Sequence, residues 1–256
     1  MWNAAQYLQF SSERDRPFFD LLSQVPTTQH PRAVADLGCG TGHLTASLLQ
    51  RFPEAQIWGL DSSDGMLESA RRHAIPGRLE FVSADLREWI APQPLEVIVS
   101  NAALQWVPDH VTLIPHLAAM LGVGGCLAVQ MPANFDAPTH TILRELTSSA
   151  TWNLDGANEP RHAQPLDWYL ETLNVLGFSV NAWETTYQHV LHGENPVLEW
   201  VKGTALRPVL ARLEGTQREA FLSEYGARLL EAYPTQSFGT VLPFKRAFFV
   251  ASKEAQ

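Results

Sequence analysis

The stretch Asp36-Leu37-Gly38-Cys39-Gly40-Thr41-Gly42 carries three glycines within five residues. It follows a mostly apolar run, residues 32–37, which has the acidic Asp36 near its end. Residues 41–52 continue it with leucines at helical spacing, so the stretch predicts a strand, a tight loop and a helix. Glycine adopts backbone angles that other residues avoid and lets a ligand approach the main chain closely. A plain βα turn is the alternative, but it does not explain three glycines after a strand-ending acid. We therefore predict a ligand-binding loop.

The surrounding sequence alternates apolar strand-like runs with amphipathic helical ones. Further strands are expected at residues 56–60, 79–82, 95–99, 125–131, 178–190 and 246–251, and helices at 63–73, 112–121, 139–150 and 166–176. Residues 196–233 have a helical pattern broken at Pro208 and Gly215, and residues 152–165 form a long polar loop. Such alternation predicts βαβ units and a mostly parallel seven-stranded sheet with helices on both faces.

This organisation predicts one α/β domain over residues 1–256. Residues 30–132 are expected to form its ligand-binding, Rossmann-like half, and residues 191–240 a helical insertion between the last two strands. In a doubly wound sheet such an insertion can lie over the carboxyl ends of the strands, where ligands bind. We therefore expect it on the substrate side.

Composition limits the class of protein. No apolar run approaches a membrane span and the first residues lack a signal-peptide pattern, while Cys39 and Cys126 are too few for a disulfide framework or a metal cluster. We expect a soluble protein of the reducing cytoplasm, with no metal. The formal net charge of −9 argues against binding to nucleic acid or to an anionic membrane. An anionic substrate would need a local group of cations.

The spacing of the glycines distinguishes two ligands. A dinucleotide-binding loop has the pattern G-x-G-x-x-G, whereas Gly38, Gly40 and Gly42 form G-x-G-x-G. Asp36 would repel a pyrophosphate but could accept a hydrogen bond from an ammonium group. The loop resembles motif I of the class I S-adenosylmethionine-dependent methyltransferases. This resemblance implies a Rossmann-like class I methyltransferase fold and S-adenosylmethionine as the cofactor.

Three later elements, at Asp61, at Asp85 and at residues 100–106, follow successive strands in the order that this family has. Asp61 can accept hydrogen bonds from both ribose hydroxyls, with a helix N-cap as the alternative role. Met66 can lie against the adenine or in the core. Asp85 resembles the residue that binds the adenine amine, and a solvent-facing loop aspartate is its alternative. The resemblance implies the following cofactor-binding residues: Tyr7, Arg16, Asp36, Gly38, Cys39, Gly40, Gly42, Asp61, Ser62, Met66, Ala84, Asp85, Leu86, Asn101 and Ala102.

Several segments are similar to one branch of this family, the trans-aconitate 2-methyltransferases. They include residues 10–17, 34–40, 59–63, 101–110, 127–132, 185–187, 200–201 and 206–208, and so extend through the insertion; residues 152–165 match least. The resemblance implies methyl transfer to one carboxylate of trans-aconitate, giving a monomethyl ester. A carboxylate is ionised at neutral pH and needs no general base, which agrees with the lack of an obvious catalytic dyad. Proximity and orientation would then supply the catalysis.

A tricarboxylate substrate needs cations and a dry site. Arg207 is the first candidate, because it lies in the insertion within a matching segment. Arg14 and Arg16 alternate with acids and can instead lie on a solvated helix face, and core packing is the alternative for each aromatic candidate, Tyr7 and Phe10 included. His140 is a lower-ranked candidate for binding the anion. We predict positioning by Trp106, Tyr187 and Arg207, and substrate binding by Trp106, His110, Tyr187, Trp200, Arg207 and Arg246.

Other functions stay open at this point. A carboxyl methyltransferase for another small molecule or for a carrier protein also needs no base, although an acidic carrier would call for a basic patch. A non-catalytic S-adenosylmethionine-binding module would bind the cofactor without turnover. The glycine spacing disfavours a nicotinamide oxidoreductase.

Overall fold

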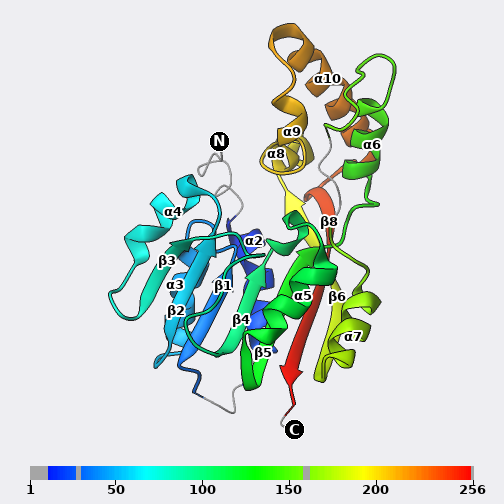
Figure 1. Cartoon of the computed structure of the whole chain (residues 1–256). Coiled ribbons are helices and arrows are strands. Elements are labelled where there is room, and N and C mark those ends of the chain that lie inside the picture. The colour runs from blue at the N-terminus through cyan, green and yellow to red at the C-terminus, as the bar shows by residue number, and fades with distance from the viewer. Residues whose placement is uncertain (1–10, 27–29, 158–161, 255–256) are drawn as a thin grey trace.

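The computed structural model (Figure 1) describes residues 11–26, 30–157 and 162–254, with side chains in the first helix described from residue 15 onward. Its strands are β1 Ala33–Leu37, β2 Gln56–Asp61, β3 Leu79–Ser83, β4 Leu95–Asn101, β5 Leu121–Pro132, β6 Phe178–Leu191, β7 Thr235–Gln236 and β8 Gly239–Lys253. Its helices are α2 Ser11–Ser23, α3 His43–Arg51, α4 Asp64–Ala70, η1 Arg71–His73, η2 Leu104–Trp106, α5 His110–Ala119, α6 Pro138–Thr147, α7 Leu166–Val175, α8 Pro196–Lys202, α9 Arg207–Leu210 and α10 Gly215–Ala232.

The central sheet has the order β3-β2-β1-β4-β5-β8-β6, with the two-residue β7 paired to β8. Neighbouring strands from β3 to β5 run parallel, and β8 lies antiparallel between β5 and β6. The strand order reverses between β1 and β4, which is where open α/β sheets bind ligands. The predicted Rossmann-like, mostly parallel seven-stranded sheet is confirmed, with β7 as a short addition.

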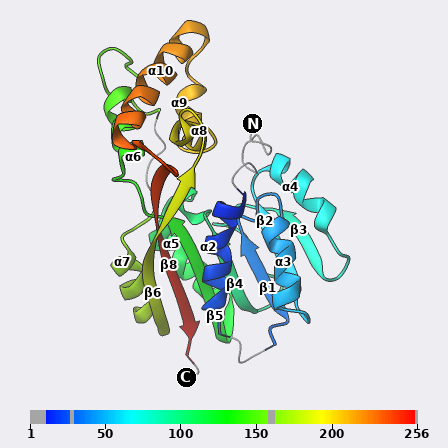
Figure 2. The ribbon, with the colours of Figure 1, turned by 180° about the vertical axis from the view of Figure 1, so that it is seen from behind.

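Side chains alternate between two apolar layers, one on each face of the sheet. Ala35, Ile98 and Leu127 pack on one side with helices α5 and α7, whereas Val34, Val99 and Ala128 pack on the other with α2 and α3. Figures 1 and 2 show these helix pairs on opposite faces. Because both faces are covered, the strands are buried and apolar, which is why they were evident in the sequence.

A helical cap stands above the carboxyl ends of the parallel strands (Figures 1 and 2). It combines α8, α9 and α10 with α6, and it has its own apolar core, which includes Trp200, Phe221 and Tyr225. The cap is therefore built from two separate segments of the chain. Helix α6 follows β5, and it packs against α10, which belongs to the insertion between β6 and β8. Sequence periodicity shows each helix but not this pairing.

Two expected boundaries are wrong. Pro208 does not break a helix but lies in the first turn of α9, where a missing N–H costs no hydrogen bond; the break falls at residues 203–206. The last strand begins at Gly239 rather than at Arg246, because β6 and β8 pair along almost their whole lengths and extend into the cap. No helix among the described residues is long and apolar enough to cross a membrane.

Candidate active site

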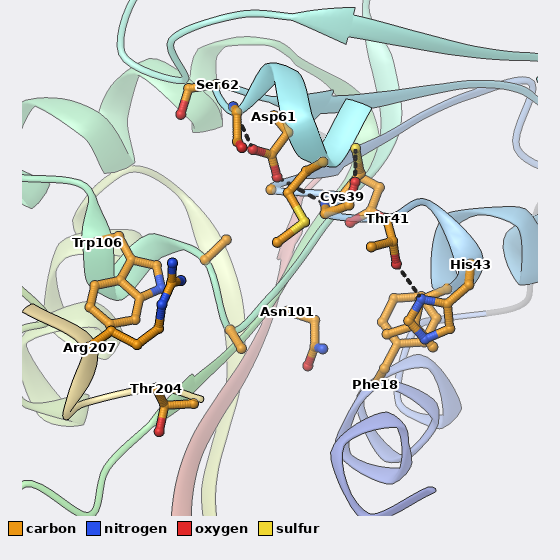
Figure 3. A pocket seen from close by; sticks show the side chains of 18 of the residues that line it. Phe18, Cys39, Thr41, His43, Asp61, Ser62, Asn101, Trp106, Thr204 and Arg207 are labelled. Carbon is orange, nitrogen blue, oxygen red and sulfur yellow. Dashed lines mark hydrogen bonds between the residues drawn. The ribbon is translucent and has the colours of Figure 1, made fainter. Parts of the chain in front are cut away.

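A cavity of about 700 Å³ opens where β1, β2 and β4 end (Figure 3). The sheet side contributes the glycine loop, the segment after β2 and the segment after β4, and the cap closes over it. The lining residues are Phe18, Asp36, Gly38, Cys39, Gly40, Thr41, His43, Leu44, Asp61, Ser62, Ser63, Met66, Asn101, Ala102, Ala103, Trp106, His162, Thr204, Arg207, Pro208 and Ala211. One cavity thus joins the predicted cofactor loop to the predicted substrate-side insertion.

The glycine loop has geometry that only glycine tolerates well. Gly38, Gly40 and Gly42 have φ angles of +78°, +55° and +76°. A Cβ on Gly38 would lie 2.1 Å from Ala103 Cβ, and one on Gly42 would lie 2.7 Å from Phe81 Cζ, whereas one on Gly40 would meet nothing within 4 Å. The outer two glycines therefore permit close packing, and the middle one leaves its backbone open toward the cavity.

The Asp61 carboxylate ties this loop to the end of β2. Its Oδ2 accepts a hydrogen bond from the Gly40 amide at 2.9 Å, and its Oδ1 accepts one from the Ser63 amide at 2.9 Å. Ser63 occupies the N-cap position of α4, and its side chain makes no capping bond. Each carboxylate oxygen can accept a second hydrogen bond, so Asp61 can hold the helix start and still bind two ribose hydroxyls.

Asp36 places a buried carboxylate at the base of the cavity. Its side chain is 3% exposed, and Thr45 Oγ1 donates to its Oδ2 at 2.6 Å. Burial raises the pKa of Asp36 to about 6, against the opposing effect of the Thr45 hydrogen bond. Asn101 Oδ1, also on the cavity lining, is buried and has no hydrogen-bond partner among the described residues. These acceptors suit a cationic ligand such as the ammonium group of S-adenosylmethionine.

The remaining predicted cofactor residues lie elsewhere. Gly42 packs behind the lining, and Ala84, Asp85 and Leu86 are not part of it. Asp85 pairs with Arg87, whose side-chain hydrogen bond lowers the pKa of Asp85 to about 2. Arg16 is exposed and pairs with Asp20 at 3.6 Å, and Tyr7 lies outside the described residues. Cofactor contacts by these residues stay predictions.

Of the predicted substrate residues, Trp106 and Arg207 line the cavity, and Figure 3 shows them across it from His43 and Phe18. The other four are not in its lining. Trp200 packs in the cap core against the His189 ring, at 4.9 Å between centroids, and Tyr187 packs beside α2 and donates to Asp20 at 2.7 Å. Their apolar rings are used in packing, which a single sequence cannot distinguish from a site wall.

His110 and Arg246 are both buried and are not part of this lining. His110 Nε2 donates to the Leu104 carbonyl at 2.9 Å, so its Nδ1 accepts from the Tyr169 hydroxyl at 2.5 Å. Burial lowers the pKa of His110, so it is a neutral residue that supports η2 below the cavity. Arg246 Nη1 donates to Gln130 Oε1 at 3.1 Å on the sheet.

Thr41 and His43 also line the cavity, although no motif in the sequence marks them as site residues. His43 Nε2 lies 3.0 Å from Asp15 Oδ1, and its Nδ1 lies 3.0 Å from Thr41 Oγ1. This chain of hydrogen bonds connects α2 to the glycine loop. Asp15 and His43 are 28 residues apart, and no local pattern predicts that they meet.

A model of the methyltransferase domain matches residues 34–125. The chain is 49% identical to a trans-aconitate 2-methyltransferase of Streptomyces avermitilis, over 99% of this chain and 97% of that protein. It is 46% identical to one of Rhodococcus jostii, over 98% of this chain and 99% of that protein. The chain belongs to the trans-aconitate 2-methyltransferase family.

Solved structures share the fold of this family member at low identity. A phosphoethanolamine N-methyltransferase 2 of Haemonchus contortus, in complex with S-adenosyl-L-methionine, matches with a TM-score of 0.60 at 16% identity, over 98% of this chain and 56% of that one. A putative S-adenosylmethionine-dependent methyltransferase of Listeria monocytogenes matches with a TM-score of 0.56 at 17% identity, over 95% and 99%. The general domain match ends at residue 125, before the cap, whereas similarity within the trans-aconitate 2-methyltransferase family extends over it.

The packing at Gly38 generates a prediction with a matched control. Gly38→Ala and Gly77→Ala both place a Cβ on a left-handed residue, with φ of +78° and +71°, but only the first meets another atom within 4 Å. Both should lose about 1–2 kcal/mol to backbone strain. Only Gly38→Ala should also weaken S-adenosylhomocysteine binding, by tenfold or more, because Ala103 must move. Calorimetry and thermal unfolding measure both effects; equal affinities would remove the loop from the binding site.

The raised pKa of Asp36 predicts a pH-dependent stability. The folded pKa of about 6 exceeds the value of 3.8 expected without burial. The contribution of Asp36 is therefore fully present below pH 4 and is lost as the pH rises through 6. Relative to Asp36→Asn, the wild type without cofactor should lose on the order of 1–3 kcal/mol of unfolding free energy between pH 4 and 7.

The same carboxylate should favour cation binding. S-adenosylhomocysteine affinity should rise between pH 5 and 7 in the wild type, because the ligand's ammonium group stabilises ionised Asp36, and should rise much less in Asp36→Asn. Denaturant unfolding at pH 4 and 7 measures the change in stability, and calorimetry at pH 5 and 7 measures the change in affinity. Parallel pH profiles for the two proteins would contradict it.

Proposed function

We propose that this chain transfers a methyl group from S-adenosylmethionine to a carboxylate of trans-aconitate, giving the monomethyl ester and S-adenosylhomocysteine. The observation that carries the proposal is that its similarity to trans-aconitate 2-methyltransferases, 49% identity over 99% of the chain, includes the cap, whose Arg207 lines the cofactor cavity. A cation in an otherwise acidic protein is what an anionic acceptor requires.

The residues of the cavity have separate tasks. S-adenosylmethionine, when bound, supplies an activated methyl group on a cationic sulfur. Asp36 and Asn101 would hold its ammonium group, and Asp61 would hold its ribose hydroxyls. Trp106 and Phe18 present aromatic surface that excludes water and can face a cation. Positioning of an already ionised acceptor is then the main catalytic task, and no residue is needed to remove a proton.

Arg207 is the cation best placed to orient the acceptor. It opens α9, with Pro208 in the same first turn, so a rigid short helix directs this part of the cap toward the cavity. A guanidinium binds a carboxylate through two parallel hydrogen bonds and fixes its plane. We therefore assign residues 191–240 to the substrate side and residues 30–132 to the cofactor side. Binding of substrate by the buried His110, Tyr187 and Trp200 stays a prediction without support from this geometry.

The −9 charge of the chain disfavours an acidic carrier protein as the methyl acceptor. Two free, buried cysteines agree with a reducing cytoplasm, the location we propose. The proposed partner is a small tricarboxylate.

Turnover with trans-aconitate should depend little on pH. The acceptor is ionised throughout the range, so the rate should change little between pH 6.5 and 9. Stopped assays that quantify S-adenosylhomocysteine and a base-labile methyl ester measure it. A tenfold rise per pH unit would indicate a protein base or a different acceptor group.

The cap arginine Arg207 should govern the affinity for the acceptor. Arg207→Ala should raise the KM for trans-aconitate about tenfold or more, as expected for a lost charge-assisted hydrogen bond of ~1.5–3 kcal/mol. Arg207→Lys should restore it only in part, because an ammonium lacks the planar fork. The control is Arg218→Ala, an exposed arginine of α10 outside the lining. If all three variants keep the wild-type KM, the anion is held elsewhere.

A further inference from the structure

A row of polar side chains crosses one face of the sheet at its ligand-binding end. Asp36, Asn101, Gln130 and Arg246 stand on β1, β4, β5 and β8, four strands that are adjacent in the sheet. By two-residue alternation each points to the side covered by α2 and α3, one step beyond an apolar residue of that layer. Those apolar residues are Val34, Val99, Ala128 and Phe248.

The strand register brings the members of this row together. Asn101 pairs with Gln130, and Pro132, two residues further along β5, pairs with Arg246. Adjacent strands lie about 4.8 Å apart, and the row also advances by two residues between β1 and β4 and again between β5 and β8, so it runs diagonally across the sheet. Asp36 and Asn101 line the cofactor cavity, so Gln130 and Arg246 continue the same row beyond it.

Gln130 carries the observation that points to a ligand. It is completely buried, and its Oε1 accepts from Arg246 Nη1 at 3.1 Å. Since a guanidinium can only donate, this contact fixes the orientation of the amide. The Nε2 group is then a buried donor, and it has no hydrogen-bond partner among the described residues. Such a donor is costly unless an acceptor reaches it.

Arg246 adds charge beside this donor. It is 4% exposed, and its Cζ lies 4.6 Å from the centroid of the Phe244 ring. The Gln130 amide oxygen and the Phe244 ring both contact the guanidinium. A buried cation next to a buried amide donor is the chemistry that recognises a carboxylate.

We propose that Gln130 and Arg246 form a second anion anchor, which binds a carboxylate of the tricarboxylate that is not being methylated. The inference rests on the proposed function and extends it. The charges along the row match the two ligands. The carboxylate of Asp36 on β1 lies at the site of the cationic cofactor, and the guanidinium of Arg246 on β8 would lie at the anionic acceptor. Arg207 would hold the acceptor from the cap and this anchor from the sheet.

Gln130→Glu tests this inference. Glutamate keeps the acceptor for Arg246 and the shape of the side chain, but it adds a negative charge beside the guanidinium and replaces the amide donor with an acceptor. The KM for trans-aconitate should rise at least tenfold, with S-adenosylhomocysteine affinity unchanged. Calorimetric titration of trans-aconitate into the S-adenosylhomocysteine complex should show the same loss without turnover. Gln188→Glu, the same change at an exposed position of β6, is the matched control.

A purely structural Gln130–Arg246 contact makes the opposite prediction. The new ion pair would then maintain or raise the unfolding temperature and leave the KM at the wild-type value, which would overturn the anchor. If Gln130→Glu does not fold, Gln130→Met, which removes the donor without adding charge, should show the same rise in KM. If the wild type neither binds nor methylates trans-aconitate, the proposed function falls and the anchor with it. If the wild type does both and the Gln130 variants keep the wild-type KM for trans-aconitate, only the anchor is contradicted.

Discussion

Hydrogen bonds between the glycine loop and the end of β2 fix the geometry on which the rest of the site depends. The amides of Gly38 and Cys39 donate to the Leu60 carbonyl at 2.7 and 2.8 Å, and the amide of Gly40 donates to Asp61 Oδ2 at 2.9 Å. These bonds hold the left-handed Gly38 and Gly40 against β2, so the loop can turn sharply into α3 while its backbone faces the cavity. Asp61 therefore connects loop, strand and α4, and a ligand that binds it meets a surface already in place.

The cavity between sheet and cap also solves a problem of charge. A protein with a net charge of −9 repels a tricarboxylate at long range, so recognition must come from a few cations placed close to the acceptor. The sheet orders its polar residues from Asp36 on β1 to Arg246 on β8, and the cap adds Arg207 from the opposite side. Cationic cofactor and anionic acceptor can then meet near Asn101. The cap is also where the chain departs from the general methyltransferase domain, which agrees with a role in substrate choice.

Sequence could predict the features that depend on local pattern. Buried parallel strands are continuous apolar runs, and the Asp36–Gly42 loop needs glycine at positions set by backbone angles, so both were evident without a structure. Features made by long-range packing were not. His110 has the residue type of a site histidine but is buried in contact with Tyr169, 59 residues away, and Tyr187 is bound to Asp20 across 167 residues. A lone aromatic or basic residue has no local signal that separates packing from binding. Gln130 shows the reverse: an ordinary strand amide became a candidate only when its contact with Arg246 was seen.

The transfer of labelled methyl groups from S-adenosylmethionine to a panel of mono-, di- and tricarboxylates tests the central claim most directly. The account predicts that trans-aconitate receives one base-labile methyl ester and has the highest kcat/KM. It also predicts that kcat/KM falls as carboxylates are removed, because each one lost forfeits a contact with a buried or cap arginine. Binding of S-adenosylmethionine with no labelling of any carboxylate, or preferential labelling of an amine or hydroxyl acceptor, would contradict it.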